Sequence, residues 1–178
     1  MLKSITFNSN FRKFTKGQIF TFKKGLNLLV GDNGSGKSSL LEVIFGKKIA
    51  GKKIDVTVKT DEYNDCYYLD LEHGNPRTKG RIETLSQIAS IFHSHGESNN
   101  SILRTISKLE DNVTVLVDEP DLALSIKSIK KLSKFLRNES TTKQIICAVH
   151  NPLLISSVSQ VLSLDHFKWV SSKDYLEE

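Results

Sequence analysis

The sequence predicts an α/β domain with a mostly parallel sheet flanked by helices and a small antiparallel β-layer at the N-terminus. Three segments, 25–30, 112–120 and 143–150, contain the continuous apolar runs that are typical of strands buried on both faces of a parallel sheet. Helix-like segments separate these strands, as parallel pairing requires. Segments 2–7 and 18–22 alternate apolar and polar residues instead, which indicates strands with one face in water.

Length and composition set the broad class. The chain has 178 residues, of which 38% are hydrophobic and 25% charged, so we expect one globular domain over residues 1–178. Cys66 and Cys147 lie far apart in apolar or aromatic runs and are interpreted as reduced core residues. No apolar run reaches the ~20 residues that span a bilayer, and the N-terminus lacks a signal-peptide pattern, so we expect a cytoplasmic protein without membrane insertion.

The first half of the chain has clear element signals. The strand at 25–30 ends at a glycine-rich turn. The segment 38–46 then places apolar residues at helical spacing, and Gly46 is able to end that helix. Segments 52–60 and 66–72 are rich in β-branched and aromatic residues and are predicted as strands.

The second half alternates helices and buried strands. Residues 73–80 have the composition of a loop, and 83–93 and 101–109 are helix candidates. Segment 124–138 repeats its apolar positions at helical spacing between the two buried strands. The expected terminal strands are 158–165 and 167–170.

The turn after residue 30 is a phosphate-binding motif. Gly31, Gly36, Lys37 and Ser38 match G-x-x-x-x-G-K-S between a strand and a helix, which is the context of a P-loop. Glycines let the backbone N–H groups and the helix N-terminus point at β-phosphate oxygens. Lys37 supplies a charge for the β- and γ-phosphates, and the Ser38 hydroxyl can ligate Mg²⁺. The predicted nucleotide-binding residues are Gly31, Asp32, Asn33, Gly34, Ser35, Gly36, Lys37, Ser38 and Ser39.

Two further strands deliver polar groups to the same edge of the sheet. The strand at 112–120 ends in Asp118, which can hold Mg²⁺ through water, and Glu119, which can polarise the attacking water. The strand at 143–150 ends in His150, which is placed to sense the γ-phosphate. The alternatives are an acidic turn for the carboxylates and a capping or packing role for the histidine. The predicted catalytic residues are Lys37, Glu119 and His150, and the predicted metal ligands are Ser38 and Asp118.

These motifs together resemble the ABC-type ATPases, and within them the DNA-repair and chromosome-maintenance branch. Residues 31–38 match Walker A, 115–120 match Walker B, 121–125 match the D-loop and His150 matches the His switch. The opening LKSITFNSNFRKF is similar to the branch's first strand and "NFR" element. The resemblance implies an ABC-type ATPase fold, ATP and Mg²⁺ as cofactors, and ATP hydrolysis.

The stretch SHGES at 94–98 occupies the place of the family signature. Ser94 and Gly96 are the matching positions, Glu97 takes the last one, and His95 replaces a glycine. The resemblance implies that this helix N-terminus meets the γ-phosphate bound by another subunit, and therefore a head-to-tail homodimer around two ATP molecules. The alternative is a simple N-cap on a surface helix.

The chain also departs from the family pattern. No clear Q-loop glutamine stands between 60 and 80, and the nearest candidates are Glu72 and Gln87. The coiled-coil insertion of the chromosome-maintenance proteins is missing, because only 56 residues separate Lys37 from Ser94, so the helical lobe must be minimal.

Two questions about nucleotide contacts stay open. Arg12, in the "NFR" element, either approaches the nucleotide phosphates or is a plain surface arginine. The candidates for stacking on adenine are Phe11, Phe14 and Phe20, and their spacing does not choose among them.

The charge and the motifs are compatible with three interpretations of the function. The net charge is +5, with lysine pairs that form either a solvated surface or a patch that faces a polyanion such as DNA. The first interpretation is an ATPase whose dimerisation drives DNA repair, recombination or defence. The second is a nucleotide-gated module that recruits an effector such as a nuclease, with slow turnover. The third, a transporter's ATPase subunit, is disfavoured by the "NFR" opening and the absent Q-loop.

Overall fold

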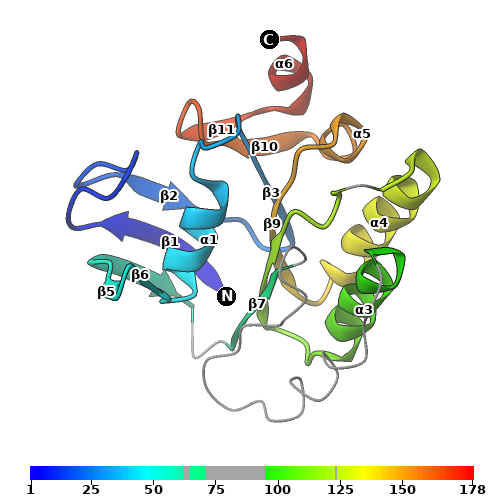
Figure 1. The fold of residues 1–178 in the computed structure, drawn as a ribbon, viewed down its shortest axis with the longest axis horizontal. Coiled ribbons are helices and arrows are strands. Elements are labelled where there is room, and N and C mark those ends of the chain that lie inside the picture. The colour runs from blue at the N-terminus through cyan, green and yellow to red at the C-terminus, as the bar shows by residue number, and fades with distance from the viewer. Residues whose placement is uncertain (62–64, 71–94, 123) are drawn as a thin grey trace.

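The computed structural model describes residues 1–61, 65–70, 95–122 and 124–178, and of residues 70 and 95–101 it describes the backbone alone. A six-stranded sheet forms its centre, in the order β11-β10-β3-β9-β8-β7 (Figure 1). All neighbouring strands are parallel except β10 and β11, which confirms the predicted mostly parallel sheet. The strands are β3 (Leu26–Val30), β7 (Cys66–Asp70), β8 (Thr114–Asp118), β9 (Gln144–Ala148), β10 (Gln160–Ser163) and β11 (Lys168–Ser171).

The predicted N-terminal β-layer is a three-stranded antiparallel sheet. Its order is β2-β1-β6, with β1 (Leu2–Phe7) in the middle, β2 (Ile19–Thr21) on one side and β6 (Val56–Thr60) on the other. In β1, Leu2, Ile5 and Phe7 are buried, so one face of the layer is apolar. This face packs on the central sheet through α1, and the layer therefore belongs to the same core.

The predicted strand at 52–60 is two strands. Lys52–Lys53 forms β5, which pairs with β4 (Lys48–Ile49), while β6 pairs with β1. Ala50 and Gly51 connect β4 to β5 and have φ values of 49° and 78°. Two consecutive residues with positive φ make the tight turn that suits a two-residue hairpin loop. Lys52 and Lys53 therefore belong to the hairpin and not to β6, the strand that follows.

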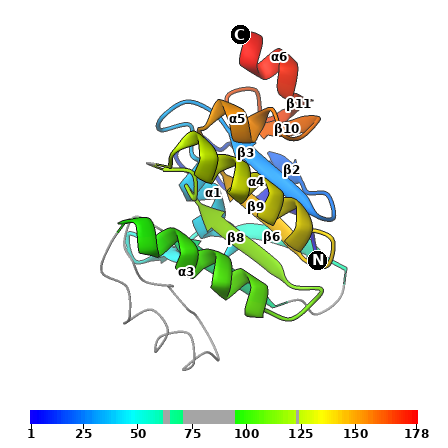
Figure 2. The same cartoon turned by 90° about the vertical axis from the view of Figure 1, so that its right-hand side faces the viewer.

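Helices cover both faces of the central sheet. On one face lie α1 (Lys37–Ile44) and the β-layer, and on the other lie α3 (His95–Lys108), α4 (Ile126–Glu139) and α5 (Pro152–Ile155) (Figures 1 and 2). Successive residues of β8 point to opposite faces, so Leu116 joins the first core and Val115 and Val117 join the second. Both faces of β8 are thus covered, which is why its central residues, 115–117, are all apolar.

Helices α1 and α4 begin and end within two residues of the predicted segments 38–46 and 124–138, whereas three other helices differ more from the prediction. Helix α3 begins at His95, six residues before the expected 101. Helix α5 was not predicted, although Asn151 caps it by accepting the Leu153 N–H at 3.0 Å and Pro152 occupies its first turn. Helix α6 (Ser172–Glu177) follows β11 and was not predicted either. The predicted loop at 73–80 and helix at 83–93 lie outside the described residues.

Both cysteines are free thiols in the structure. Burial raises the pKa of Cys66 to about 12 and that of Cys147 well above its usual value, so both stay protonated at neutral pH. Within the part of the chain that the structure describes, we find no helix with the length and apolar character to cross a bilayer. A single domain over residues 1–178 stays a prediction.

Candidate nucleotide-binding site

The turn between β3 and α1 has the backbone of a phosphate-binding loop. Gly31, Gly34 and Gly36 have φ values of 147°, 77° and 104°, which side-chain-bearing residues rarely adopt. A Cβ atom on Gly36 would also lie 2.8 Å from the Phe14 ring, so glycine is required there for two reasons. No side chain caps α1, so its first N–H groups and the positive end of its dipole face the turn. This geometry suits a bound phosphate.

The side chain of Lys37 is folded against this turn. Its Nζ donates to the carbonyl oxygens of Gly31 at 2.8 Å and Asp32 at 3.1 Å, and the residue is only 5% exposed. Burial lowers the pKa of Lys37, and the carboxylates of Glu119, Asp165, Asp118 and Asp32 oppose that shift. The ammonium group is therefore held at the phosphate-binding turn in a partly desolvated position.

The carboxyl end of β8 brings Asp118 to the start of α1. The Ser38 hydroxyl donates to Asp118 Oδ1 at 3.1 Å, and the Tyr68 hydroxyl donates to Asp118 Oδ2 at 2.9 Å. Ser38 and Asp118 thus present neighbouring oxygen atoms, which are the ligands Mg²⁺ prefers. Sequence reasoning missed Tyr68, because only the pairing of β7 with β8 brings it near Asp118.

Glu119 and His150 follow β8 and β9 and are in contact. The His150 Nε2 lies 3.0 Å from Glu119 Oε1. Glu119 has a φ of 49°, a conformation that is uncommon for a residue with a side chain and that is frequent at functional sites. The structure therefore places the predicted water-activating carboxylate and the predicted γ-phosphate sensor side by side.

Asp121 holds the two segments in this arrangement. Its Oδ2 accepts the backbone N–H of His150 at 2.7 Å and that of Asn151 at 2.5 Å. The residue is buried, and it joins the turn after β8 to the turn after β9. The sequence marked 121–125 as a D-loop by resemblance, but no local signal in it indicates this bond.

A cavity of about 240 Å³ opens between these groups. Arg12 reaches it from the β-layer, and its guanidinium donates to the Ser39 hydroxyl. The structure therefore places Arg12 beside the predicted phosphate site, while its contact with phosphate stays a prediction. The residues that line the cavity are Arg12, Lys13, Asn33, Gly34, Gly36, Lys37, Ser38, Ser39, Glu119 and His150.

The buried aromatic residues narrow the choice of an adenine-stacking side chain. Phe14 and Phe20 are each 1% exposed and pack edge to face at 5.5 Å in the core, so neither presents a free ring face. Phe11 is half-buried, and the Arg12 guanidinium lies 5.3 Å above its ring. Of the three candidates, Phe11 alone remains.

The predicted signature is described only in part. Ser94 lies outside the described residues, as do the Q-loop candidates Glu72 and Gln87. His95, Gly96 and Glu97 form the first turn of α3. This helix belongs to the core on the face of the sheet opposite α1 (Figure 2). The start of α3 and the phosphate-binding turn therefore lie in different layers of the molecule.

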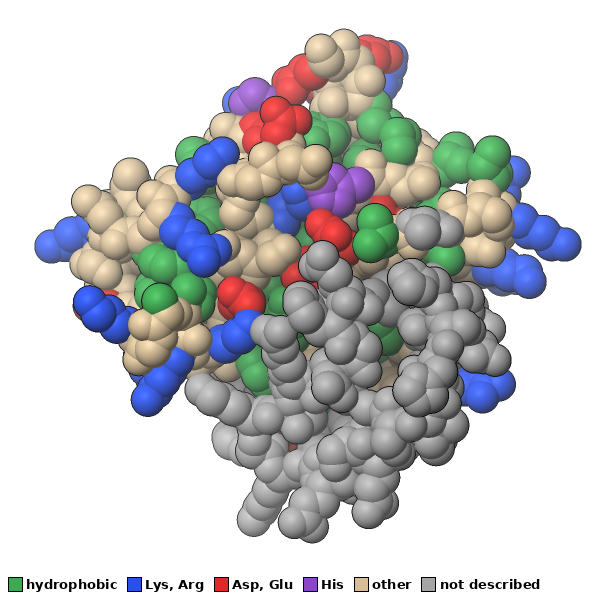
Figure 3. All heavy atoms as spheres, in the orientation of Figure 1, with side chains coloured by type: hydrophobic (Ala, Val, Ile, Leu, Met, Phe, Trp, Pro, Cys, Tyr) green, Lys and Arg blue, Asp and Glu red, His purple; other side chains and the backbone are tan. Residues whose placement is uncertain are grey.

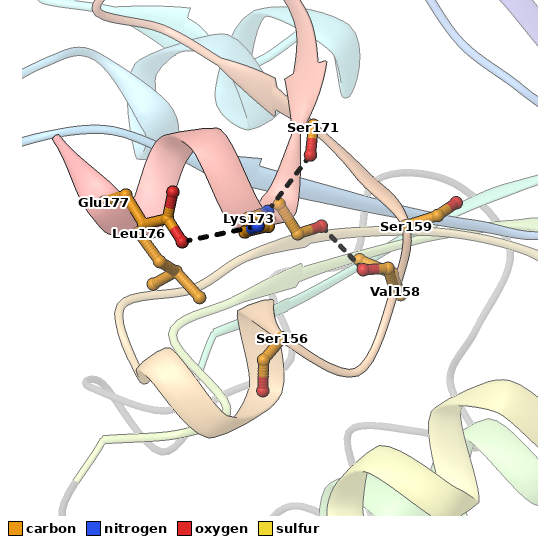
Figure 4. Close-up of a pocket in the computed structure, with 8 residues that line it drawn as sticks. Ser156, Val158, Ser159, Ser171, Lys173, Leu176 and Glu177 are labelled. Atoms are coloured by element: carbon orange, nitrogen blue, oxygen red, sulfur yellow. Dashed lines mark hydrogen bonds and ion pairs between the residues drawn. The ribbon is translucent and has the colours of Figure 1, made fainter.

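A larger cavity of about 360 Å³ lies between the end of α5 and α6 (Figure 4). Two of its serine side chains already bond to the backbone: Ser172 Oγ donates to the Val158 carbonyl at 2.6 Å, and Ser171 Oγ accepts the Lys173 N–H at 3.2 Å. Its charged groups, Lys173 and Glu177, are exposed and 3.8 Å apart. The side chains that line this cavity do not converge on a position for a phosphate group. The larger cavity is therefore not the candidate nucleotide-binding site.

Comparison with known proteins supports the assignment of the fold. The sequence profile of a family described as "AAA domain" matches residues 9–178. The chain is 27% identical over 191 residues to the ATP-binding protein Uup of Buchnera aphidicola, which covers 92% of this chain and 32% of that protein. It is 28% identical over 122 residues to the DNA replication and repair protein RecF of Acetivibrio thermocellus, which covers 66% of this chain and 32% of that protein. The chain thus spans about a third of the length of these relatives.

Solved structures with the same fold include three ATPase domains. A metal-chelate type ABC transporter superposes with a TM-score of 0.65 at 18% identity, over 97% of this chain and 84% of that one. A dimeric ATP-binding cassette bound to ADP and Pi superposes with a TM-score of 0.59 at 18% identity, over 96% of this chain and 97% of that one. The SMC head domain of Thermotoga maritima superposes with a TM-score of 0.54 at 13% identity, over 91% of this chain and 94% of that one. These likenesses confirm the predicted fold class.

Proposed function

This chain belongs to the AAA domain family of ATPases, and on that premise we propose that it hydrolyses ATP with Mg²⁺ as a head-to-tail homodimer that serves a DNA-related process. The observation that carries hydrolysis is the contact between Glu119 and His150 at the mouth of the Lys37 site. A nucleotide-binding protein without turnover has no need of a carboxylate held there by a histidine.

The residues of the site can each take one of the roles that transfer of a phosphoryl group to water requires. Nζ of Lys37 exchanges the carbonyls of Gly31 and Asp32 for the β- and γ-phosphate oxygens, and the N–H groups at the start of α1 bind the same phosphates. Glu119 accepts a proton from the attacking water, and His150 holds its carboxylate in place. Ser38 and Asp118 would hold Mg²⁺, which neutralises charge on the phosphate oxygens when bound.

Asp118→Asn tests the metal assignment. The amide keeps the shape of the side chain and its contact with Tyr68 but removes a negative charge from the cation site, so we expect the Mg²⁺ concentration for half-maximal turnover to rise about tenfold or more. A Mg²⁺ titration of phosphate release checks this. Asp111→Asn, an exposed control on the loop before β8, should leave the titration unchanged. Unchanged metal dependence in Asp118→Asn would count against the role of Asp118.

The opposite placement of α1 and α3 supports the dimer. The signature segment at the start of α3 and the P-loop at the start of α1 lie on different faces of one sheet. A second subunit in head-to-tail orientation brings its α3 to this P-loop, with two ATP molecules between the subunits. The similar ATP-binding cassette was solved as a dimer with ADP and Pi.

The distribution of charge supports a nucleic-acid partner. Residues 1–61 carry twelve Lys and Arg against four Asp and Glu, whereas the remaining residues carry thirteen against sixteen. Lys48, Lys52 and Lys53 lie exposed on the β4–β5 hairpin, and Figure 3 shows basic side chains spread over the side of the molecule that the β-layer forms. A basic surface of this kind attracts the phosphate backbone of DNA without reading its sequence.

Replacing Lys52 and Lys53 together by Gln should weaken duplex DNA binding about tenfold at low salt and lower the slope of log affinity against log salt by about two. Fluorescence anisotropy across a salt series, with ATP and Mg²⁺ present, measures both quantities. The matched control replaces Lys130 and Lys131, an exposed pair on α4, and should change neither. Absence of DNA binding by the unsubstituted chain at low ionic strength would remove the DNA partner.

Turnover with and without DNA distinguishes the DNA-related ATPase from the gating module. Steady-state phosphate release by the unsubstituted chain, measured with and without duplex DNA, should rise in the presence of DNA. Slow turnover that DNA does not change would instead support the module that recruits an effector such as a nuclease. The fold alone does not choose between these and the transporter subunit, because it is similar to transporter and chromosome-maintenance domains alike.

A further inference from the structure

The turn between β10 and β11, residues 164–167, lies against the start of the P-loop. Strand β10 pairs in parallel with β3, and the Leu164 N–H donates to the Val30 carbonyl at 2.9 Å. The next residue, Asp165, accepts the backbone N–H of Asp32 with both carboxylate oxygens, at 3.2 Å and 3.0 Å. The backbone entering the P-loop is therefore bound to a carboxylate from the C-terminal part of the chain.

This contact acts on the peptide that also positions Lys37. The Lys37 ammonium binds the carbonyls of Gly31 and Asp32 while Asp165 binds the N–H of Asp32. A Cβ atom on Gly31 would lie 3.1 Å from Asp165 Oδ2 and 2.6 Å from Ser35 Oγ. The space around Gly31 is thus filled by these two side chains, and a shift of Asp165 would be transmitted to the loop.

The same turn reaches the other end of the P-loop through aromatic packing. The Phe167 ring packs edge to face on Phe14 and Phe20, with centroid distances of 6.5 Å and 6.2 Å. Phe14 in turn lies beneath Gly36, the last residue before α1. Asp165 therefore contacts the first half of the loop directly, and Phe167 supports the second half through Phe14.

Helix α6 adds a third group at this place. The Tyr175 phenol lies near the same carboxylates: burial raises its pKa, Asp165 and Asp32 raise it further, and the backbone of Gly31 opposes the shift. The C-terminal helix is thus close enough to the loop entrance to respond to it electrostatically.

We propose that the 164–167 turn clamps the P-loop in its phosphate-binding shape, and that Asp165 is the positioning residue through which it sets nucleotide affinity. This role rests on the proposed nucleotide-binding function. None of the motifs places Asp165 in the site, and it is not among the residues that line the cavity beside Lys37. It acts through the N–H of Asp32.

The charge of Asp165 and its hydrogen bonds have opposite effects on nucleotide affinity, so an experiment can separate them. A carboxylate near a triphosphate repels it, so a merely neighbouring charge would weaken binding, and its removal would tighten binding. A positioning carboxylate holds the loop ready, and loss of its hydrogen bonds would weaken binding. Asp165→Ala removes charge and acceptor together, whereas Asp165→Asn removes the charge and keeps one acceptor oxygen.

The test is the equilibrium affinity for ATP and ADP with Mg²⁺, measured with a fluorescent nucleotide, together with thermal unfolding without nucleotide. We expect Asp165→Ala to bind both nucleotides about five- to tenfold more weakly than the unsubstituted chain, since charged hydrogen bonds are among the stronger ones. Asp165→Asn should bind as well as the unsubstituted chain or better. Asp174→Ala, which removes an exposed carboxylate from the first turn of α6, is the matched control and should change nothing.

Phe167→Ala provides an independent variant if Asp165→Ala does not fold. Phe167 is 39% exposed, so its loss costs little of the core, and we expect about threefold weaker nucleotide binding through the freed Phe14. If Asp165→Ala and Phe167→Ala both bind nucleotide as tightly as the unsubstituted chain, the clamp is overturned and the proposed function is not. Tighter binding in Asp165→Ala identifies Asp165 as a repelling charge. Failure of the unsubstituted chain to bind either nucleotide overturns the clamp and the proposed function together.

Discussion

Glu119→Gln should lower ATP turnover by about 10²–10⁴-fold while ATP stays bound, and the ATP-bound chain should accumulate as a dimer. The amide keeps the shape of the side chain and can still bond to His150, whose Nε2 lies 3.0 Å from Glu119 Oε1. It cannot accept the proton of the attacking water, so the ATP that bridges two subunits persists. ADP should leave this variant monomeric, because it lacks the γ-phosphate that we propose the partner's signature binds.

Phosphate release and light scattering at on the order of tens of micromolar protein measure the two effects, since transient interfaces are weak. In the Glu119→Gln background, Ser94→Arg adds bulk at the signature and should return the trapped dimer to monomer with nucleotide binding retained. Ser107→Arg is the matched control: it places the same side chain on an exposed position near the other end of α3 and should leave the dimer intact. If Glu119→Gln stays monomeric with ATP, residues 94–98 are a helix cap and not a signature.

Lys37→Ala should weaken ATP binding by about a hundredfold or more, because the ammonium is the one side-chain cation placed to span the β- and γ-phosphates in the P-loop. The fold should be kept. Removing Lys37 loses two hydrogen bonds to the carbonyls of Gly31 and Asp32 but also relieves the burial that lowers the pKa of its ammonium. We therefore expect the unfolding temperature to change by only a few degrees, about 1 kcal/mol for a domain of this size.

A fluorescent-nucleotide titration measures the loss of binding, and circular dichroism follows the unfolding temperature. The matched control is Lys48→Ala, which removes an exposed lysine of strand β4, beyond the far end of α1. Substitutions of exposed residues change stability little, so nucleotide affinity and unfolding temperature should both stay close to those of the unsubstituted chain. Lys37→Ala with undiminished ATP binding would show that the nucleotide lies elsewhere.

The family, and the succession of buried strands and helices along the chain, could be predicted from the sequence. The resemblance to ABC-type ATPases rested on the P-loop at 31–38 and the carboxylates at 118–119, and the family match over residues 9–178 confirms it. These motifs are readable because their chemistry depends on residue types at fixed spacing along one segment. The strands β8 and β9 could be predicted because both of their faces are buried, so their central residues are apolar in succession.

Boundaries that depend on a single turn were less predictable. The composition of 52–60 indicated one strand, but positive φ at Ala50 and Gly51 closes a hairpin first and divides the segment into β5 and β6. The start of α3 at His95 was also missed, because polar residues such as Glu97 and Asn99 carry no apolar periodicity. In both segments, local composition indicated the type of structure but not where it begins.

From the sequence by itself we could predict which groups would do the chemistry, namely Lys37, Ser38, Asp118, Glu119 and His150, since each stands at the end of a predicted strand or the start of a helix; their roles stay predictions. Only the tertiary structure decided which side chains support them. Tyr68, Asp121 and Asp165 each bond to a site residue far from it in the chain, and Phe14 and Phe20 prove to be core residues. The reason is physical: a motif acts through neighbours in sequence, whereas a supporting contact depends on which strands pair and how layers pack.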